Sequence, residues 1–250
     1  MFSPRVALAS LSGQSDADWA LAGSEWAGAA FLGGLALDDP TRTAARQMVS
    51  RRDRSEFLPE DPFRFIRREL TAVTGADLTP GFNVRAVDLE SLGRAAAICA
   101  DHDAIVEINA HCRQPEMTAR GAGQALLEAP ETLRQQIETA AGTGAPVSVK
   151  VRAEVPGVDL PTVSERAGAA GADIIHVDAM DSESVIAEVV DHTDTFVLAN
   201  NEVRDRESVQ EYLSYGADAV SVARPSTDPA VLRRVHRAVE DWFGNAAEPN

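Results

Sequence analysis

Lys150 is the residue in this sequence with the clearest chemical implication. The chain has 23 basic residues, and Lys150, inside the apolar run VSVKVR, is the only lysine among them. A compact ammonium on a flexible stem makes a point contact that the planar guanidinium of arginine cannot make. A lysine in such a run binds an anion or a carbonyl or forms a Schiff base, or else it pairs with a carboxylate. We interpret Lys150 as a functional residue.

Cys112 is the second candidate, because its surroundings favour a reactive thiol. It lies in the polar segment EINAHCRQPE, between His111 and Arg113. Positive charge beside a thiol lowers its pKa and increases its reactivity. We therefore predict that Cys112 is a general acid, with a passive thiol as the alternative. Cys99 lies in a helical pattern over residues 92–100 and is expected in the core.

Polar side chains also follow several other apolar runs. His176 closes the run ADIIHV, where a histidine is as often a satisfied core residue as a ligand. The neighbouring run ends favour the second role for it. The residues at the ends of the first, fifth, seventh and eighth runs are Ser10, Arg152, Asn200, Asn201, Glu202, Ala223 and Arg224.

The apolar runs are predicted to be eight strands, each followed by a helix. Several runs are apolar at nearly every position, which is typical of parallel strands covered on both faces. Among the helical patterns between them, one begins at Pro130 and stops at Gly142, and others start from Asp205 and Asp228 as caps. The predicted strands are 6–9, 28–32, 82–87, 104–110, 146–152, 173–177, 195–200 and 219–223.

Eight strand–helix units in 250 residues have the size and rhythm of a (β/α)8 TIM barrel of the α/β class. A doubly wound sheet is the alternative, but no G-x-G-x-x-G pattern follows the first strand. We therefore predict a single TIM-barrel domain over residues 1–250, with an extended helical insertion at about 38–80 that holds two helices. Such barrels build their active sites at the carboxyl ends of the strands, where the residues above converge.

Charge and cysteine content restrict the function classes. The 39 acidic residues give a net charge of -16, which argues against a general nucleic-acid or anionic-membrane binder. This acidic, lysine-poor composition resembles that of high-salt cytoplasms, so we expect a halophilic protein. Two cysteines form neither a disulfide framework nor a zinc set, and we predict no metal. Because we find no signal peptide and no apolar run of ~20 residues, we expect a soluble, cytoplasmic protein.

Seven segments, in order, resemble the dihydrouridine synthase family of FMN-dependent barrels and, more distantly, the dihydroorotate dehydrogenases. The family's P-V-x-V-K-I-R is similar to PVSVKVR, and its D-I-N-x-G-C-P and G-A-G-x-x-L-L-x-x-P segments are similar to EINAHCRQPE and ARGAGQALLEAPE. The other family segments are similar to ASLSGQSD, IIHVDA, LANNEV and GADAVSVARP. The resemblance covers about residues 5–225 and extends to the shorter archaeal barrels related to these synthases.

The resemblance implies a site that binds FMN and a pyrimidine ring. Cys112 would protonate one carbon of the ring's double bond while reduced FMN delivers hydride to the other, with NAD(P)H as the transient electron donor. The residues that it places around FMN are Ser10, Asn83, Lys150, His176, Asn200, Asn201, Glu202, Ala223 and Arg224. Those that it places around the substrate are Asn109, His111, Arg113 and Arg152.

This sequence departs from the family pattern at three places. His111 and Arg113 flank the cysteine where the family has Gly and Pro, so we expect a different loop around the thiol. Asn201 and Ala223 replace glycines that let the backbone approach the FMN phosphate, which adds bulk where close approach is needed. The synthases carry a C-terminal helical domain that binds tRNA, and we identify no such segment after the eighth predicted helix.

The substrate is therefore open between tRNA uridine, the leading hypothesis, and a smaller pyrimidine-like molecule. Arginines 42, 46, 51, 52 and 54, interrupted by Asp53, form the one locally basic stretch, which is a solvated helix face or an RNA-phosphate contact. Three further hypotheses are a flavin dehydrogenase of a free pyrimidine or pterin-like metabolite, a flavin-free phosphate-binding barrel with Lys150 as a Schiff-base lysine, and a scaffold without catalysis. The sequence indicates no oligomeric state.

Overall fold

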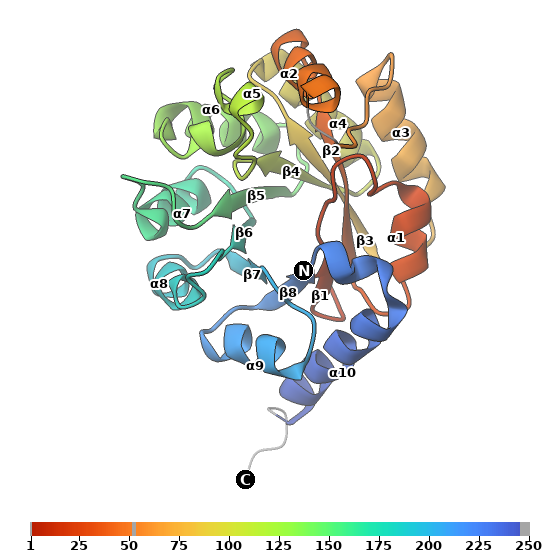
Figure 1. The fold of residues 1–250 in the computed structure, drawn as a ribbon, viewed down its shortest axis with the longest axis vertical. Helices are drawn as coiled ribbons and strands as arrows, with labels where there is room; N and C mark the ends of the chain where they lie inside the picture. Colours follow the sequence, from red (N-terminus) through yellow and green to blue (C-terminus); the bar gives the residue numbers. More distant parts are fainter. Residues whose placement is uncertain (1, 52–53, 246–250) are drawn as a thin grey trace.

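Eight parallel strands form one closed barrel in the computed structural model, which describes residues 2–51 and 54–245 (Figure 1). Consecutive strands are neighbours all the way round, and the first pairs with the last to close the sheet. The strands are β1 (Val6–Leu8), β2 (Ala29–Ala36), β3 (Thr79–Arg85), β4 (Ile105–Asn109), β5 (Val147–Arg152), β6 (Ile174–Asp178), β7 (Phe196–Asn200) and β8 (Ala219–Val222).

The predicted (β/α)8 fold is confirmed, and each predicted strand is found. The largest differences are at β2, which runs on to Ala36, and at β3, which already begins at Thr79. The β2 extension contains Gly33 and Gly34, both at positive φ, and the pairing of β2 with β3 shifts register there. Such a bulge adds a residue that strand periodicity alone does not anticipate.

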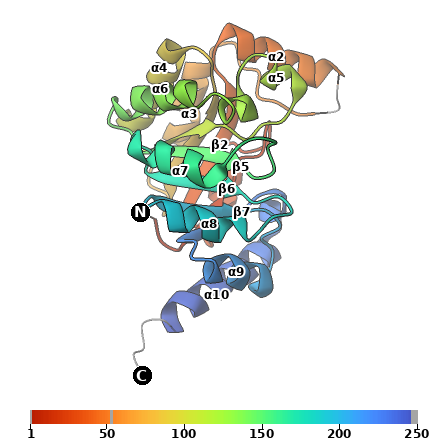
Figure 2. The same ribbon diagram turned by 90° about the vertical axis from the view of Figure 1, so that its left-hand side faces the viewer.

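Helices alternate with the strands and lie outside the barrel (Figures 1 and 2). They are α1 (Ala17–Gly23), α2 (Asp39–Arg51), α3 (Pro62–Ala72), α4 (Leu89–Asp101), α5 (Pro115–Thr118), α6 (Pro130–Ala141), α7 (Leu160–Ala169), α8 (Val185–His192), α9 (Arg206–Ser214) and α10 (Pro229–Asn245), with 3-10 helices η1 (Gly123–Leu126) and η2 (Arg224–Thr227). The helices expected from Pro130, Asp205 and Asp228 are present. The two expected between residues 38 and 80 are α2 and α3, both between β2 and β3.

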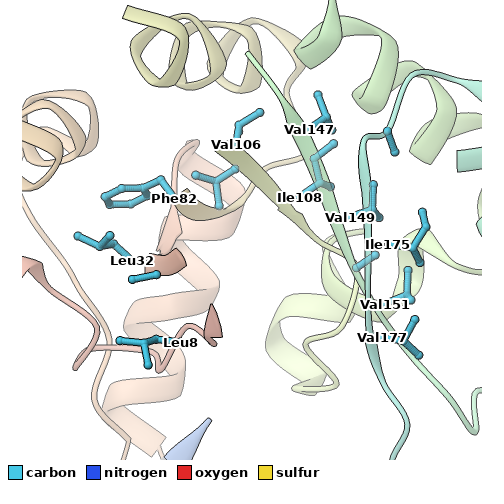
Figure 3. Close-up of a cluster of buried hydrophobic side chains, with 14 of the residues drawn as sticks. Leu8, Leu32, Phe82, Val106, Ile108, Val147, Val149, Val151, Ile175 and Val177 are labelled. Atoms are coloured by element: carbon cyan, nitrogen blue, oxygen red, sulfur yellow. The ribbon is translucent and has the colours of Figure 1, made fainter. Parts of the chain in front are cut away.

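Strand alternation divides the side chains into an outer apolar set and an inner set. Successive side chains of a strand point to opposite faces. In β5, Val147, Val149 and Val151 belong to the large core cluster between barrel and helices, which Figure 3 shows in part. Ser148, Lys150 and Arg152 therefore point into the barrel. The same alternation runs through β4 and β6, so polar residues gather inside a sheet whose outer face is apolar.

The barrel interior is apolar near the amino ends of the strands, which we call the lower end, and polar toward their carboxyl ends. A separate buried cluster closes the lower end; it consists of Phe2, Ala7, Ala29, Phe31, Ile105, Ile174, Leu198 and Ala219, with Phe196 packed against it. Above it the inner positions are Asn83, Glu107, Ser148, Lys150, His176 and Ser221, all of them buried. The closed lower end leaves the carboxyl ends of the strands as the entrance for a ligand.

No helix in the part of the chain that the structure describes combines the length and the apolar character needed to cross a membrane.

Asp38 links the loops around the upper end of the barrel. Its Oδ1 accepts hydrogen bonds from the Thr41 amide at 3.0 Å and the Thr41 hydroxyl at 2.7 Å, at the start of α2. Its Oδ2 accepts from the amides of Val87 at 2.6 Å and Asp88 at 3.0 Å, at the start of α4. One buried carboxylate thus satisfies helix-end donors on both sides of β3.

We predict that Asp38→Ala lowers the free energy of unfolding by about 2–4 kcal/mol, because it removes a helix cap and also takes the side-chain acceptor from the partly buried amides of Val87 and Asp88. Urea unfolding measures the loss. The matched control is Asp61→Ala, since Asp61 is an exposed cap of α3 that accepts from Phe63 and Arg64; it should cost about 1 kcal/mol. Equal losses in the two variants would contradict this account.

Candidate active site

A cavity of about 440 Å³ lies at the carboxyl ends of the strands, where the sequence predicted the site. Its volume is within the range of about 300–1,000 Å³ that small-molecule sites occupy. Of the predicted site residues, those that line it are Ser10, Asn83, Asn109, His111, Cys112, Arg113, Lys150, Arg152, Asn200, Asn201, Glu202, Ala223 and Arg224. Residues from six of the eight strand ends and their loops therefore meet at one cavity, and His176 is the one predicted residue outside its lining.

A larger hollow of about 700 Å³ at the amino ends of β6, β7 and β8 has a structural explanation. Asp173 and Asp218 line it, but each uses a carboxylate oxygen to accept a strand-start amide, from Val147 at 2.8 Å and from Val197 at 2.9 Å. These acids hold strands together. No group of three or more metal-ligating side chains is found there or elsewhere among the described residues.

Glu107, on β4, is a fully buried carboxylate at the centre of the polar layer. Its Oε2 contacts His176 Nδ1 at 2.7 Å and accepts from the Ser148 hydroxyl at 3.0 Å, and its Oε1 accepts from the Asn83 amide at 2.7 Å. An ionised carboxylate accepts but cannot donate. Each of these three partners must therefore present a proton to Glu107.

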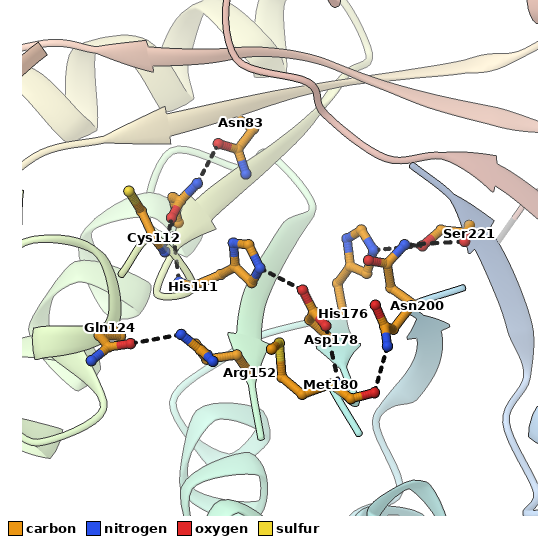
Figure 4. A network of polar contacts seen from close by, with 12 residues as sticks. Asn83, His111, Cys112, Gln124, Arg152, His176, Asp178, Met180, Asn200 and Ser221 are labelled. Carbon is orange, nitrogen blue, oxygen red and sulfur yellow. Dashed lines mark hydrogen bonds and ion pairs between the residues drawn. The ribbon is translucent and has the colours of Figure 1, made fainter. Parts of the chain in front are cut away.

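The hydrogen bonds continue on both sides of Glu107 and form a chain across the barrel; Figure 4 shows the links on the side of His176, Ser221 and Asn200, without Glu107 itself. On one side, His176 Nε2 meets the Ser221 hydroxyl at 2.7 Å, and the Asn200 amide donates to the same hydroxyl at 2.7 Å. On the other side, Asn83 Oδ1 accepts from the Asn109 amide at 2.9 Å. We call this set, Asn200–Ser221–His176–Glu107–Asn83–Asn109, the polar chain.

The polar chain ends at the loop that carries the candidate acid. Asn109 Oδ1 accepts from the backbone amides of Cys112 at 2.9 Å and His111 at 3.3 Å. The predicted substrate residue Asn109 lines the cavity, yet its carbonyl oxygen is used to fix the cysteine loop. Its role in this structure is therefore to position Cys112.

The directions of the hydrogen bonds set the charge states. Burial opposes ionisation of Glu107, but its interaction with His176, the charge of Lys150 and the hydrogen bond from Asn83 together lower the pKa of Glu107. Burial, followed by the positive charge of Lys150, lowers the pKa of His176 despite the attraction of Glu107. His176 is thus a neutral imidazole whose Nδ1–H donates to Glu107 and whose Nε2 accepts from Ser221.

His176 is the predicted cofactor residue that does not line the cavity. Its side chain is fully buried below the cavity, and both ring nitrogens make hydrogen bonds inside the barrel. It pairs with Lys150 on β5 and lies one inward-facing position below Asp178, which does line the cavity. The FMN contact expected for His176 stays a prediction.

Lys150 enters the cavity without a protein partner. It is only 4% exposed and lines the cavity, and among the described residues no hydrogen bond or ion pair to its ammonium is found. The carboxylate pairing that the sequence left open as an alternative is therefore absent from this part of the chain. A buried charge without a partner is costly, which points to a ligand that Lys150 contacts.

His111 and Asp178 form a close pair at the cavity wall. His111 Nε2 lies 2.5 Å from Asp178 Oδ2, and Asp178 Oδ1 accepts from the Met180 amide at 3.2 Å. Against the effect of burial, the interaction with His111, together with the charge of Lys150, lowers the pKa of Asp178 to about 2. Burial lowers the pKa of His111 in spite of that bond. His111 therefore donates from Nε2 to an ionised Asp178 at neutral pH.

The loop around Cys112 depends on a glycine from the following segment. Cys112 is 8% exposed, and its carbonyl accepts the Gln124 amide at 3.0 Å. Gly123 has a φ of +64°, and a Cβ there would lie 2.2 Å from the Cys112 carbonyl oxygen. Only glycine allows this approach. The G-A-G part of the sequence thus shapes the cysteine loop.

The loop after β7 holds two non-glycine residues in left-handed conformations. Asn201 has a φ of +118° and Glu202 a φ of +48°. The Asn201 amide donates to the Met180 carbonyl, and the Asn201 carbonyl accepts from the Tyr212 hydroxyl at 3.0 Å. The departure from glycine noted in the sequence is therefore accommodated by strain that these hydrogen bonds offset.

The basic stretch divides between the cavity and the surface. Arg54 lines the cavity, while Arg42 donates to the Pro59 carbonyl at 2.7 Å and ties α2 to the loop before α3. Arg46 and Arg51 lie on α2. Arg52 and Asp53 lie outside the described residues.

Several site residues were missed from the sequence. Arg85, buried on β3, pairs with Glu56 at 2.8 Å and also donates to Ser12, which joins the loops after β1, β2 and β3. Asp178, the second residue after His176, lines the cavity but is not among the predicted site residues. Glu107 had a readable signal, because a charged residue inside the apolar run AIVEINA must have partners if that run is a buried strand.

Comparisons with known proteins give a family match. The sequence profile of the family described as dihydrouridine synthase matches residues 82–248. An uncharacterized protein of Methanocaldococcus jannaschii is 29% identical over 233 residues, which cover 88% of each of the two chains.

Solved structures match in fold at low identity. A FabK variant from Thermotoga maritima has a TM-score of 0.61 at 14% identity over 90% of this chain; the match spans 63% of the FabK chain, less than two thirds of it. An NCR variant from Zymomonas mobilis has a TM-score of 0.64 at 14% identity, over 95% of this chain and 88% of that one. A tryptophan synthase chain from Pyrococcus furiosus has a TM-score of 0.59 at 12% identity, over 97% and 98%. These likenesses establish the barrel fold alone.

We predict that Asn201→Ala destabilises the protein more than Asn201→Gly. Alanine keeps the strain of a positive φ and loses the amide bond to Met180, whereas glycine loses the bond but removes the strain. The two variants should differ by about 1 kcal/mol in free energy of unfolding. Urea unfolding of both variants measures this, and an alanine variant as stable as the glycine variant would show that position 201 is unstrained.

We also predict that stability falls as the pH drops below about 6.5, the ordinary value for histidine. The pKa values of His176 and His111 are lowered in the fold, so the unfolded chain binds protons there that the folded chain does not. Buried His176 contributes close to one proton, and His111, a third exposed, contributes less. Each full proton changes the free energy of unfolding by about 1.4 kcal/mol per pH unit.

Urea unfolding from pH 7.5 to 5 measures this slope, and His111→Gln, which can still donate to Asp178, should reduce it. A free energy of unfolding that is flat or rises on acidification through this range would show that the imidazoles become charged in the folded protein.

Proposed function

This chain belongs to the dihydrouridine synthase family, and on that premise we propose that it is an FMN-dependent oxidoreductase that reduces the C5–C6 double bond of a uracil ring, with uridine in tRNA as the leading substrate. The observation that carries the proposal is Lys150, a buried ammonium that lines the cavity and has no hydrogen-bond or ion-pair partner among the residues that the structure describes. A flavin ring offers such a cation carbonyl oxygens and a nitrogen.

The charge of the cavity supports an anionic cofactor. Its lining includes six cations in a chain whose net charge is -16; they are Arg54, Arg85, Arg113, Lys150, Arg152 and Arg224. Asp178 and Glu202 are the carboxylates among the same lining residues. Glu56 neutralises Arg85, but the other cations of the lining still outnumber its carboxylates. The residues present therefore fit a group that combines a phosphate with a planar polar ring.

We assign the residues that would hold FMN from their places around the cavity. Lys150 and Asn83 would contact the ring, with Ser10 at the wall formed after β1. Asn200, Asn201, Glu202, Ala223 and Arg224, at the ends of β7 and β8, would surround the phosphate. When bound, reduced FMN supplies the hydride, and NAD(P)H is proposed as the source of its electrons.

The protein's own part of the reaction is a proton. Reduction of the C5–C6 bond adds a hydride to one carbon and a proton to the other. Cys112, which lines the cavity, would give that proton. Asn109 fixes the loop through two backbone amides, so the thiol is held rather than free to swing. His111 and Arg152, in the same wall, would contact the ring.

A free pyrimidine is a second candidate, and one observation favours it. The cations gather inside the cavity, while the chain as a whole carries a net charge of -16 that repels a polyanion such as RNA at long range. A small substrate would use the cavity cations and would not need a basic outer surface. Dihydrouridine content in tRNA from a deletion strain separates the candidates, since an unchanged content would exclude the tRNA substrate.

We expect purified protein to bind one equivalent of FMN, and Lys150→Met to weaken binding at least tenfold, because a buried cation is replaced by an apolar chain of similar length. Cys112→Ala should bind FMN like the wild type and lose at least a hundredfold in the rate of ring reduction. Flavin fluorescence titration and single-turnover oxidation of the reduced flavin measure the two effects.

The control for both variants is Cys99→Ala, which removes a thiol buried in the core, away from the cavity. Wild-type protein that takes up no FMN would contradict the proposal. Trapping of a carbonyl ligand on Lys150 by borohydride would establish the Schiff-base alternative instead. Intact turnover by Cys112→Ala would remove the acid assignment alone.

A further inference from the structure

Arg152 presents a buried guanidinium to the cavity with most of its bonding capacity unused by the protein. It is 7% exposed and lines the cavity. Its Nη1 donates to the neutral Gln124 side chain at 3.0 Å, and its Nε is buried with no hydrogen-bond partner (Figure 4). Among the described residues no carboxylate forms an ion pair with it.

A second cation, Arg113, adds to this charge instead of balancing it. Arg113, an exposed residue of the loop after β4, lines the same cavity. Burial and then the charge of Arg113 lower the pKa of Arg152, while Asp178 and Glu154 act in the opposite direction. An arginine stays charged in proteins, so the two cations repel. The nearest cavity carboxylate, Asp178, is already engaged by His111 and by the Met180 amide.

The proposed FMN phosphate does not account for this pair. That phosphate is assigned to the ends of β7 and β8, whereas Arg152 ends β5 and Arg113 follows β4. In the closed barrel, β6 separates β5 from β7, so the two groups of cations lie on different parts of the rim. Cys112, the proposed proton donor, is adjacent to Arg113 and hydrogen-bonded to Gln124 through its backbone.

We propose that Arg113, Arg152 and Gln124 form a receptor for an oxyanion carried by the substrate, a carboxylate on the pyrimidine ring or a phosphate on its sugar. The inference rests on the proposed function for the identity of the ring, but not for the anion. Two guanidiniums present planar, paired donors that match the oxygens of either group. The Gln124 bond holds one donor of Arg152 fixed, so the remaining donors face the anion already ordered.

The receptor implies that the substrate carries a negative charge. A neutral ring such as uracil would leave both guanidiniums without an anionic ligand, while a ring with an oxyanion would neutralise part of their charge. Because Cys112 is held by the same segment, the anion would also fix the ring relative to the thiol. The receptor therefore selects substrates by charge and orients them for protonation.

The experiment is calorimetric titration of the FMN-loaded protein at constant ionic strength with three probes: uracil, uracil-6-carboxylate and uridine 5′-monophosphate. We expect at least one charged probe to bind at least tenfold more tightly than uracil, and Arg113→Gln to reduce that ratio at least fivefold. Arg113→Lys should restore part of it, and Arg152→Gln should weaken the charged probe more than uracil. The matched control is Arg166→Gln, which removes an equal charge from exposed α7.

The outcome identifies the source of the oxyanion and separates this inference from the proposed function. Preference for the carboxylate probe or for the phosphate probe supports the receptor and names its ligand. If no uracil compound binds, sulfate binding to the flavin-free protein, followed by thermal shift, is compared in wild type and Arg113→Gln. Weaker sulfate binding in the variant supports the receptor and overturns the uracil substrate. Equal binding in both, or a charge preference that Arg113→Gln leaves unchanged, overturns the receptor.

Discussion

Glu107 is a carboxylate with no access to water, and such a group persists in a fold only where hydrogen bonds and opposite charge replace its hydration. Side chains from β3, β5 and β6 provide the hydrogen bonds, and Lys150 provides charge. Because the carboxylate can only accept, it fixes the direction of every bond in the polar chain. From this one constraint follow the tautomer of His176, the orientation of Asn83 and, through Asn109, the position of the cysteine loop.

The same constraint links the two halves of the cavity. Asn200, beside the proposed phosphate region, and Asn109, which holds the Cys112 loop, are opposite ends of one run of hydrogen bonds. A cavity wall built from separate loops would allow each to move alone. Here the strand ends share a buried framework, so the groups that would bind cofactor and donate the proton are held in a common geometry. Precise placement of reacting groups is a large part of catalysis.

The fold and most of the cavity could be predicted from the sequence because both depend on local patterns. Apolar runs identify strands, and polar residues at their ends identify the rim of a barrel, which is how Lys150, Cys112 and Asn201 were found. The position of His176 below the cavity and the pairing of Arg85 with Glu56 could not be predicted in this way. They depend on how neighbouring strands are aligned and on the bulge in β2, and local sequence patterns do not specify either. Glu107 was recognisable as a charge within an apolar run, but its partners lie on three other strands.

Nitrogen-15 NMR of the histidine rings tests the central claim most directly, since it reports how the proton on His176 is held by Glu107. The account predicts a neutral His176 at pH 7 that carries its proton on Nδ1, and that remains neutral as the pH is lowered through 6.5 in the folded protein. A neutral ring protonated on Nε2 would contradict it, because Nδ1 could not then donate to the buried carboxylate. A charged imidazolium at pH 7 would also contradict it, because Nε2 would then donate to Ser221 instead of accepting from it.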